Sequence, residues 1–197
     1  MIFQNLVVYI TIGVIILLCL KIYTESDSYN LICIISDVDG ERYCVRERSK
    51  LQLAANLLAE TTNKCKMLVA YVSTNYSDNK DVARLVKKFD PTKISETLPT
   101  SEHVAYSENK GEKVAFCLNT TKEGNKLIDI NTLTFVAIHE LSHIMTESEG
   151  HNQVFWENFK FLLENAKKAN IIDLVNYKKK PQEYCGMTIT DNPYYDL

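Results

Sequence analysis

The chain has 197 residues, 46% of them apolar and 24% charged, with a formal net charge of −3. These values exclude a disordered or collagenous chain, and they give no strong signal for nucleic-acid binding, which usually comes with a basic excess. Because the sequence has only 6 Gly and 4 Pro, it favours long helices over a turn-rich sandwich, and we expect an α+β fold.

The first twenty residues, MIFQNLVVYITIGVIILLCL, contain no charged side chain. A helix of that length matches the roughly 30 Å hydrocarbon thickness of a bilayer. We therefore expect a transmembrane anchor over residues 1–22, with residues 2–20 in contact with the membrane, followed by one folded domain over residues 23–197. A cleaved signal peptide remains an alternative, although it usually has Lys or Arg before the apolar run. A buried core helix is a further alternative, but it normally shows a polar face.

The side of the membrane on which the domain lies is indicated by few residues. Lys21 is the one basic residue near the apolar segment, and by the positive-inside rule it favours a cytosolic domain. The cysteines outside this segment form an odd set without framework spacing, which agrees with a reducing compartment: Cys33, Cys44, Cys65, Cys117 and Cys185. Glycosylation sequons at Asn75 and Asn119 would matter only in a luminal domain.

Four elements are expected before the most informative segment. The apolar runs on both sides of Asp37-Val-Asp-Gly predict a β-hairpin. Residues 49–74 have apolar side chains near one face and no Gly or Pro, which predicts a long helix. A shorter helix over residues 81–89 ends before Pro91. Residues 103–118 predict a second hairpin that turns at Lys110-Gly111.

The segment NTLTFVAIHELSHIM, residues 131–145, predicts a helix with Asn131 as its N-cap. His139 and His143 are one helical turn apart on a shared side, and Glu140 follows the first of them. This is the pattern H-E-x-x-H. Two imidazoles at this spacing can bind one zinc ion, and the carboxylate can take a proton from the attacking water.

A catalytic zinc needs a third protein ligand, and His151 is the first candidate. Gly150 can end the preceding helix and turn the chain back, and residues 154–166 predict a second amphipathic helix just after it. The alternatives for the third ligand are a Cys117 thiolate or a loop carboxylate, Glu147 or Glu149.

The segment HELSHIMTESEGHNQVFW resembles the active-site segment of the WLM metallopeptidases, which are relatives of the SprT-like zinc peptidases. It is most similar to a branch found in large DNA viruses. The resemblance extends to VDGERYCVR, AANLLAE, NKGEKVAFCL and YCGMTITDNP, and so covers most of residues 36–193. Seven residues separate His143 from His151, more than in better-known members, so the substrates of those members are not carried over.

This resemblance implies a zincin-like domain that holds Zn²⁺ through His139, His143 and His151. It implies Glu140 as the catalytic base and a protein or peptide as the substrate. In the C-terminal segment, Tyr184 is a candidate to support an oxyanion, and Met187 is a candidate for a turn beneath the zinc.

Two other classes of function stay open. A protein that keeps this fold for structural or assembly purposes would bind zinc without turnover. A non-peptidase metal hydrolase would be expected to use a Cys ligand, which here points to Cys117.

Overall fold

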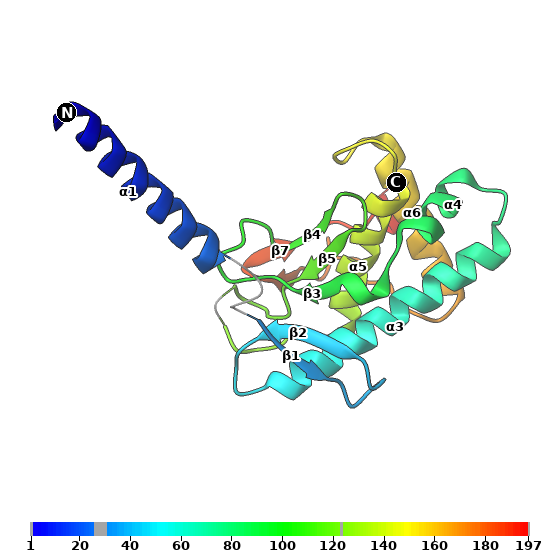
Figure 1. The fold of residues 1–197 in the computed structure, drawn as a ribbon. Helices are drawn as coiled ribbons and strands as arrows, with labels where there is room; N and C mark the ends of the chain where they lie inside the picture. Colours follow the sequence, from blue (N-terminus) through cyan, green and yellow to red (C-terminus); the bar gives the residue numbers. More distant parts are fainter. Residues whose placement is uncertain (1, 26–30, 123, 197) are drawn as a thin grey trace.

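Three helices and a small β-sheet pack around the helix that carries the two neighbouring histidines (Figure 1). The computed structural model describes residues 2–25, 31–122 and 124–196. In the described residues the helices are α1 (Ile2–Glu25), α3 (Leu51–Asn75), α4 (Lys80–Lys88), α5 (Ile130–Met145), α6 (Gln153–Lys168) and α7 (Pro193–Asp196), with a short 3₁₀ helix η1 (Pro91–Lys93). The strands there are β1 (Leu31–Ile35), β2 (Arg42–Arg46), β3 (Ile94–Glu96), β4 (Ala105–Glu108), β5 (Lys113–Phe116), β6 (Gln182–Tyr184) and β7 (Met187–Ile189).

The helical core forms around α5, which packs against α3, α4 and α6. The long helix α3 is uninterrupted, as its lack of Gly and Pro predicted, and it buries Leu58 and Leu68 completely. Leu133 and Leu141 of α5 and Phe159 of α6 lie in the same core. Because α5 is buried on several sides, the positions of its histidines are fixed by packing over its whole length.

Both expected hairpins form. β1 and β2 pair antiparallel, and Gly40 in their turn has φ +74°, a conformation that favours glycine. β4 and β5 also pair antiparallel, and their turn takes positive φ at Asn109, Lys110 and Gly111. β3, which the sequence did not predict, adds in parallel to β5, so the strand order is β3-β5-β4 and β4 lies at an edge.

The prediction of Asn131 as a helix cap is wrong. The N-cap of α5 is Asp129, whose carboxylate accepts hydrogen bonds from the backbone N–H and the hydroxyl of Thr132. Asn131 lies in the first turn instead. Its side-chain amide donates to the carbonyl of Asp173 and accepts from the N–H of the same residue, which joins α5 to the chain after α6.

Residues 2–25 form the helix α1, but the expected transmembrane anchor over residues 1–22 is not supported. In the part of the chain that the structure describes, no helix is both long enough and apolar enough to cross a membrane. Residues 1–7 of the expected anchor lie outside the part of α1 whose side chains the structure describes.

Four of the five cysteines outside α1 form disulfides, although their odd number favoured a reducing compartment. Cys33 and Cys44 join the directly opposed positions of β1 and β2. Cys117, just after β5, is joined to Cys185 in the turn between β6 and β7. Cys65 is free and buried in α3, so the odd count arises from a core thiol and gives no argument for a reducing compartment.

Candidate metal centre

α5 brings the first three residues of the site together. His139 and His143 lie one turn apart on the side of α5 that faces the chain between α5 and α6, and their imidazole Nε2 atoms are 3.2 Å apart. Glu140 is buried beside them, with 4% of its surface exposed. The H-E-x-x-H segment therefore presents two imidazole nitrogens and one carboxyl group at one place, as its spacing predicts.

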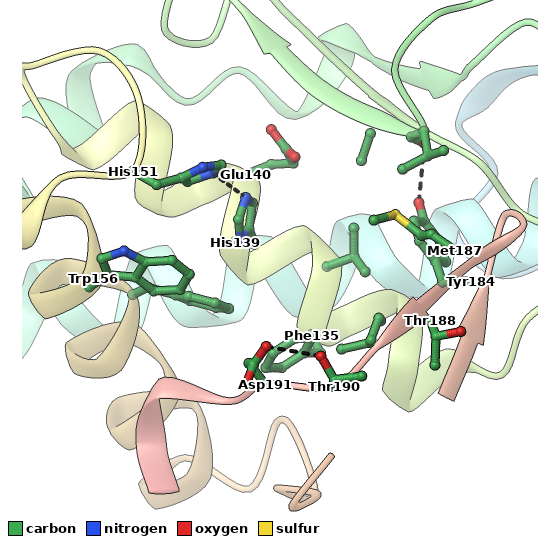
Figure 2. A pocket seen from close by; sticks show the side chains of 15 residues that line it. Phe135, His139, Glu140, His151, Trp156, Tyr184, Met187, Thr188, Thr190 and Asp191 are labelled. Atoms are coloured by element: carbon green, nitrogen blue, oxygen red, sulfur yellow. Dashed lines mark hydrogen bonds between the residues drawn. The ribbon is translucent and has the colours of Figure 1, made fainter. Parts of the chain in front are cut away.

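The chain after α5 returns His151 to the same point. Gly150 takes φ +76°, and Asn152 caps α6 by accepting a hydrogen bond from the N–H of Phe155 at 3.1 Å. Between this turn and this cap, His151 places its Nε2 3.0 Å from the Nε2 of His143 and 3.1 Å from that of His139. The convergence of His151 on His139 is visible in Figure 2.

These distances fit a zinc ion. Nitrogen ligands lie 2.0–2.1 Å from zinc, so two of them on a tetrahedral ion are about 3.3 Å apart. Three Nε2 atoms 3.0–3.2 Å apart come within a few tenths of an ångström of that value. They would supply three ligands to a zinc ion, the number of protein ligands found in catalytic zinc sites.

The imidazoles are also in the protonation state that can bind a metal cation. Burial, together with the neighbouring imidazoles, lowers the pKa of His139 to about 3 and that of His143 to about 4. Burial lowers the pKa of His151 as well. The three rings are therefore neutral at neutral pH, which is the state in which imidazole binds a metal.

Aromatic side chains of α6 hold the imidazoles in place. The Phe155 ring lies 4.3–4.9 Å from the rings of all three histidines, measured between ring centroids. Phe159 packs against His139 at 5.2 Å, and Trp156 lies 5.7 Å from His151. Since α5 and α6 are also joined by a hydrogen bond from Asn158 to Thr146, the rings have little freedom to turn away.

Two basic side chains form hydrogen bonds and ion pairs with the loop that leads to His151. Arg84 of α4 donates to the carbonyl of Met145 at 2.7 Å and pairs with Glu147 at 2.9 Å. Lys110, in the turn between β4 and β5, donates to the carbonyl of Ser148 at 2.8 Å and pairs with Glu149 at 3.4 Å. No local sequence pattern points to Arg84 or Lys110, because their partners are far along the chain.

Replacing both Arg84 and Lys110 should weaken zinc binding. We expect an Arg84→Met, Lys110→Met double variant to lower the zinc affinity roughly 10-fold, the lower bound for groups that orient zinc ligands. Competition with a chromophoric chelator measures this affinity. The matched control is Lys87→Met on the same helix as Arg84, at an exposed position. An unchanged affinity in the double variant would show that the loop holds His151 without them.

The alternatives for the third ligand lie elsewhere. The Cys117 sulfur is bound to that of Cys185 and is not free to bind a metal. The side chains of Glu147 and Glu149 are 83% and 88% exposed and are paired with Arg84 and Lys110. His151 is therefore the residue that the structure brings to the pair on α5.

Glu140 lies where two cavities meet. The larger, about 330 Å³, opens between α5, α6 and the β6–β7 hairpin; Figure 2 shows His139, His151 and Glu140 around it. The smaller, about 170 Å³, lies toward His103, Tyr106 and Lys110. β4 contributes to both, with Ala105 in the larger cavity and Tyr106 and Ser107 in the smaller one, so this edge strand runs past Glu140 from one cavity to the other.

Tyr184 and Met187 both line the larger cavity. Tyr184 is buried, and its hydroxyl donates to the carbonyl of Val104 at 3.3 Å. Burial, and after it the charge of Glu140, raises the pKa of Tyr184 well above its ordinary value, so the hydroxyl keeps its proton. Met187 is 49% exposed on β7 and lies across the cavity from His139 (Figure 2). Their functional roles stay predictions.

Burial raises the pKa of Glu140 to about 8 in the metal-free protein. Between its ordinary value and pH 8, the folded state holds a proton that the unfolded state has lost, so the free energy of unfolding falls as the pH rises. The lowered pKa values of the histidines act in the opposite direction, because the unfolded state still binds protons near pH 6.5 and the folded state does not. This contribution ends above about pH 7.5, and it is shared by the wild type and a Glu140 variant, so it cancels when the two are compared.

Glu140→Gln should remove this pH dependence. Between pH 6.5 and 8, the metal-free wild-type protein should lose up to about 1.4 kcal/mol per pH unit relative to the variant. Urea unfolding in the presence of a chelator measures the difference. Parallel stability curves would contradict a raised pKa for Glu140.

The comparisons with known proteins agree with the geometry. The family model described as "WLM domain" matches residues 79–194, more than half of the chain. An uncharacterized protein of Acanthamoeba polyphaga mimivirus is 26% identical over 161 residues, which are 80% of this chain and 81% of the relative. An uncharacterized protein of Invertebrate iridescent virus 6 is 32% identical over 84 residues, which are 41% of this chain and 44% of the relative.

No solved structure gives a significant match to the chain. The region matched by the family model begins before α4 and ends in α7. It thus contains the three histidines, Glu140, the residues of β4 that line the two cavities and the residues of β7 that line the larger one. The chain belongs to the WLM domain family, and its viral relatives place it with the viral members of that family.

Proposed function

We propose that this protein is a zinc-dependent metallopeptidase that hydrolyses peptide bonds. The observation that carries the proposal is the convergence of three neutral imidazoles, those of His139, His143 and His151, beside the buried carboxylate of Glu140. A zinc ion held by these imidazoles would supply Lewis acidity, which lowers the pKa of a water molecule and polarises a carbonyl group.

Glu140 has the position of the general base. Its carboxyl group lines both cavities and so lies where a substrate spanning them would pass. A raised pKa makes it a carboxylate that accepts a proton readily, and it can pass that proton on to the leaving amine. Zinc in the site would lower this pKa again by its charge, which keeps Glu140 ionised at neutral pH before it accepts the proton.

β4 offers a way to orient the substrate. It is an edge strand of the β3-β5-β4 sheet, and residues 104–107 run from the larger cavity to the smaller one. An extended peptide that adds to this edge through main-chain hydrogen bonds would cross Glu140 with side chains directed into both cavities. Such binding recognises the backbone first, which suits a peptide rather than a small metabolite.

The other classes receive less support. The non-peptidase hydrolase would use Cys117 as a ligand, and this residue is held in a disulfide. A structural protein would not need a buried carboxylate, which lowers stability when ionised, beside its metal ligands.

The test is hydrolysis of a peptide pool by the zinc-loaded full chain, followed by mass spectrometry. Cleavage should appear with zinc, stop when a chelator removes the metal, and return when zinc is added back. Absence of any cleavage by protein that contains stoichiometric zinc would contradict the proposal.

A further inference from the structure

The two cavities that meet at Glu140 differ in polarity. The smaller cavity is lined mainly by residues with polar or charged side chains, among them His103, Ser107, Lys110 and Glu149. The larger cavity is mainly apolar. A peptide that spans both would therefore meet an apolar environment on one side of the scissile bond only.

The base of the larger cavity is aromatic. Phe135 and Phe159 pack at 5.2 Å between ring centroids, and Trp156 lies 6.3 Å from Phe159. Phe159 also contacts the ring of His139. This aromatic surface is thus directly next to the metal ligands, so a side chain resting on it belongs to a residue beside the reacting bond.

The β6–β7 hairpin forms the opposite wall. Met187 and Ile189 are two residues apart on β7, so they point to the same side of the strand, and both line the cavity. Met187 is half exposed although it is apolar. Figure 2 shows its side chain across the cavity from His139, while the aromatic ring of Phe135 lies at the base.

This wall is held in place. The Cys117–Cys185 disulfide ties the hairpin to the end of β5. The N–H groups of Cys185 and Gly186 donate to the carbonyls of Asn119 and Thr120 at 3.0 and 2.9 Å, and Tyr184 donates to Val104. The cavity therefore has a fixed width, which is what discrimination between side chains by size requires.

We propose that this cavity receives one large apolar side chain of the substrate, from the residue adjacent to the scissile bond, and that Met187 is a specificity-determining residue. The proposal rests on the proposed peptidase function. About 330 Å³ lies at the lower end of small-ligand pockets, which suits a single side chain rather than a larger group. An aromatic or long aliphatic side chain should be preferred over Ser or Asp about 10- to 100-fold in kcat/KM, because it leaves water for an apolar surface.

The first measurement is the residue preference around each bond that the zinc-loaded full chain cleaves in a random peptide pool. One position next to the cleaved bond should be enriched in large apolar residues. Met187→Glu places a charge on the wall and should reduce this enrichment at least 10-fold. The matched control is Met67→Glu on α3, since Met67 is a similarly exposed methionine, at 56%, that does not line the cavity.

The second measurement does not depend on turnover. Phenylacetohydroxamic acid and acetohydroxamic acid bind zinc through the same group and differ by a phenyl ring. The zinc-loaded wild type and Met67→Glu should bind the phenyl compound at least 10-fold more tightly, and Met187→Glu should lose most of this difference.

The outcomes separate the two proposals. If no peptide is cleaved but the phenyl compound is preferred, the peptidase function fails and the apolar pocket stands. Equal affinities for the two hydroxamates, or an enrichment that Met187→Glu leaves intact, overturn the specificity proposed here.

Discussion

Glu140→Gln is expected to keep its zinc and its fold and to lose most of its turnover. The substitution preserves the size of the side chain, and it leaves the Nε2 atoms of His139, His143 and His151 in place. It removes the carboxylate that we propose accepts the proton of the attacking water. Positioned acid–base groups contribute roughly 10²- to 10⁴-fold in rate, so kcat for a cleaved peptide should fall by that factor.

The control for this variant is Glu157→Gln, an exposed position of α6 outside both cavities. Both variants should contain as much zinc as the wild type by atomic absorption, and only Glu140→Gln should be inactive. Loss of zinc in Glu140→Gln would mean that this residue is a ligand. A wild-type rate would mean that another group is the base, and Glu149 in the smaller cavity would be the first to examine.

The sequence predicted well the parts of the site that depend on local geometry. The spacing of His139 and His143 determines that they share a side of α5 once the helix forms, and the uninterrupted apolar pattern indicates the helix. The contribution of His151 could be predicted because a positive-φ glycine and a helix start flank it within two residues. In each case the residues that determine the position of the histidine are its near neighbours in the sequence.

Features that depend on distant contacts could not be predicted in this way. β3 is three residues long, and its Glu96 is fully buried because it accepts hydrogen bonds from the backbone N–H of Arg46 and from the side chain of Arg48. From the sequence alone, a short segment that contains a glutamate predicts a surface loop, because the partners that bury this side chain are far along the chain. The pairing of Cys117 with Cys185 likewise joins residues 68 apart and has no local signal.

The β6–β7 hairpin was missed for a related reason. Its two-residue turn has positive φ at Cys185 and Gly186, whereas the common sequence signals for such a turn are Asn-Gly and Asp-Gly. Cys185 takes this conformation where the disulfide and the hydrogen bond to Asn119 hold it. The β6–β7 hairpin is the wall of the larger cavity that we propose selects the substrate. Its turn conformation is therefore determined by tertiary contacts and not by local sequence propensity.

The three histidines proposed as ligands should each be needed for stable zinc binding. Wild-type protein should hold about one zinc per chain, and His139→Ala, His143→Ala and His151→Ala should each lower the affinity more than the 10- to 100-fold typical of groups that only orient a ligand. His103→Ala is the matched control, because His103 is the remaining histidine of the chain and lies outside the triad. Zinc affinity is measured by chelator competition, and circular dichroism verifies the fold.

The His151 variant is the most informative of the three. His139 and His143 are held by the same helix, so their joint role follows from α5 alone, whereas His151 reaches the site only through the loop braced by Arg84 and Lys110. His151→Ala that retains stoichiometric zinc would contradict the assigned triad. The third ligand would then have to be Glu147 or Glu149, which requires breaking their ion pairs, because Cys117 could bind only after reduction of its disulfide. Repeating the measurement with Glu147→Gln and Glu149→Gln in the His151→Ala background would identify which carboxylate had taken its place.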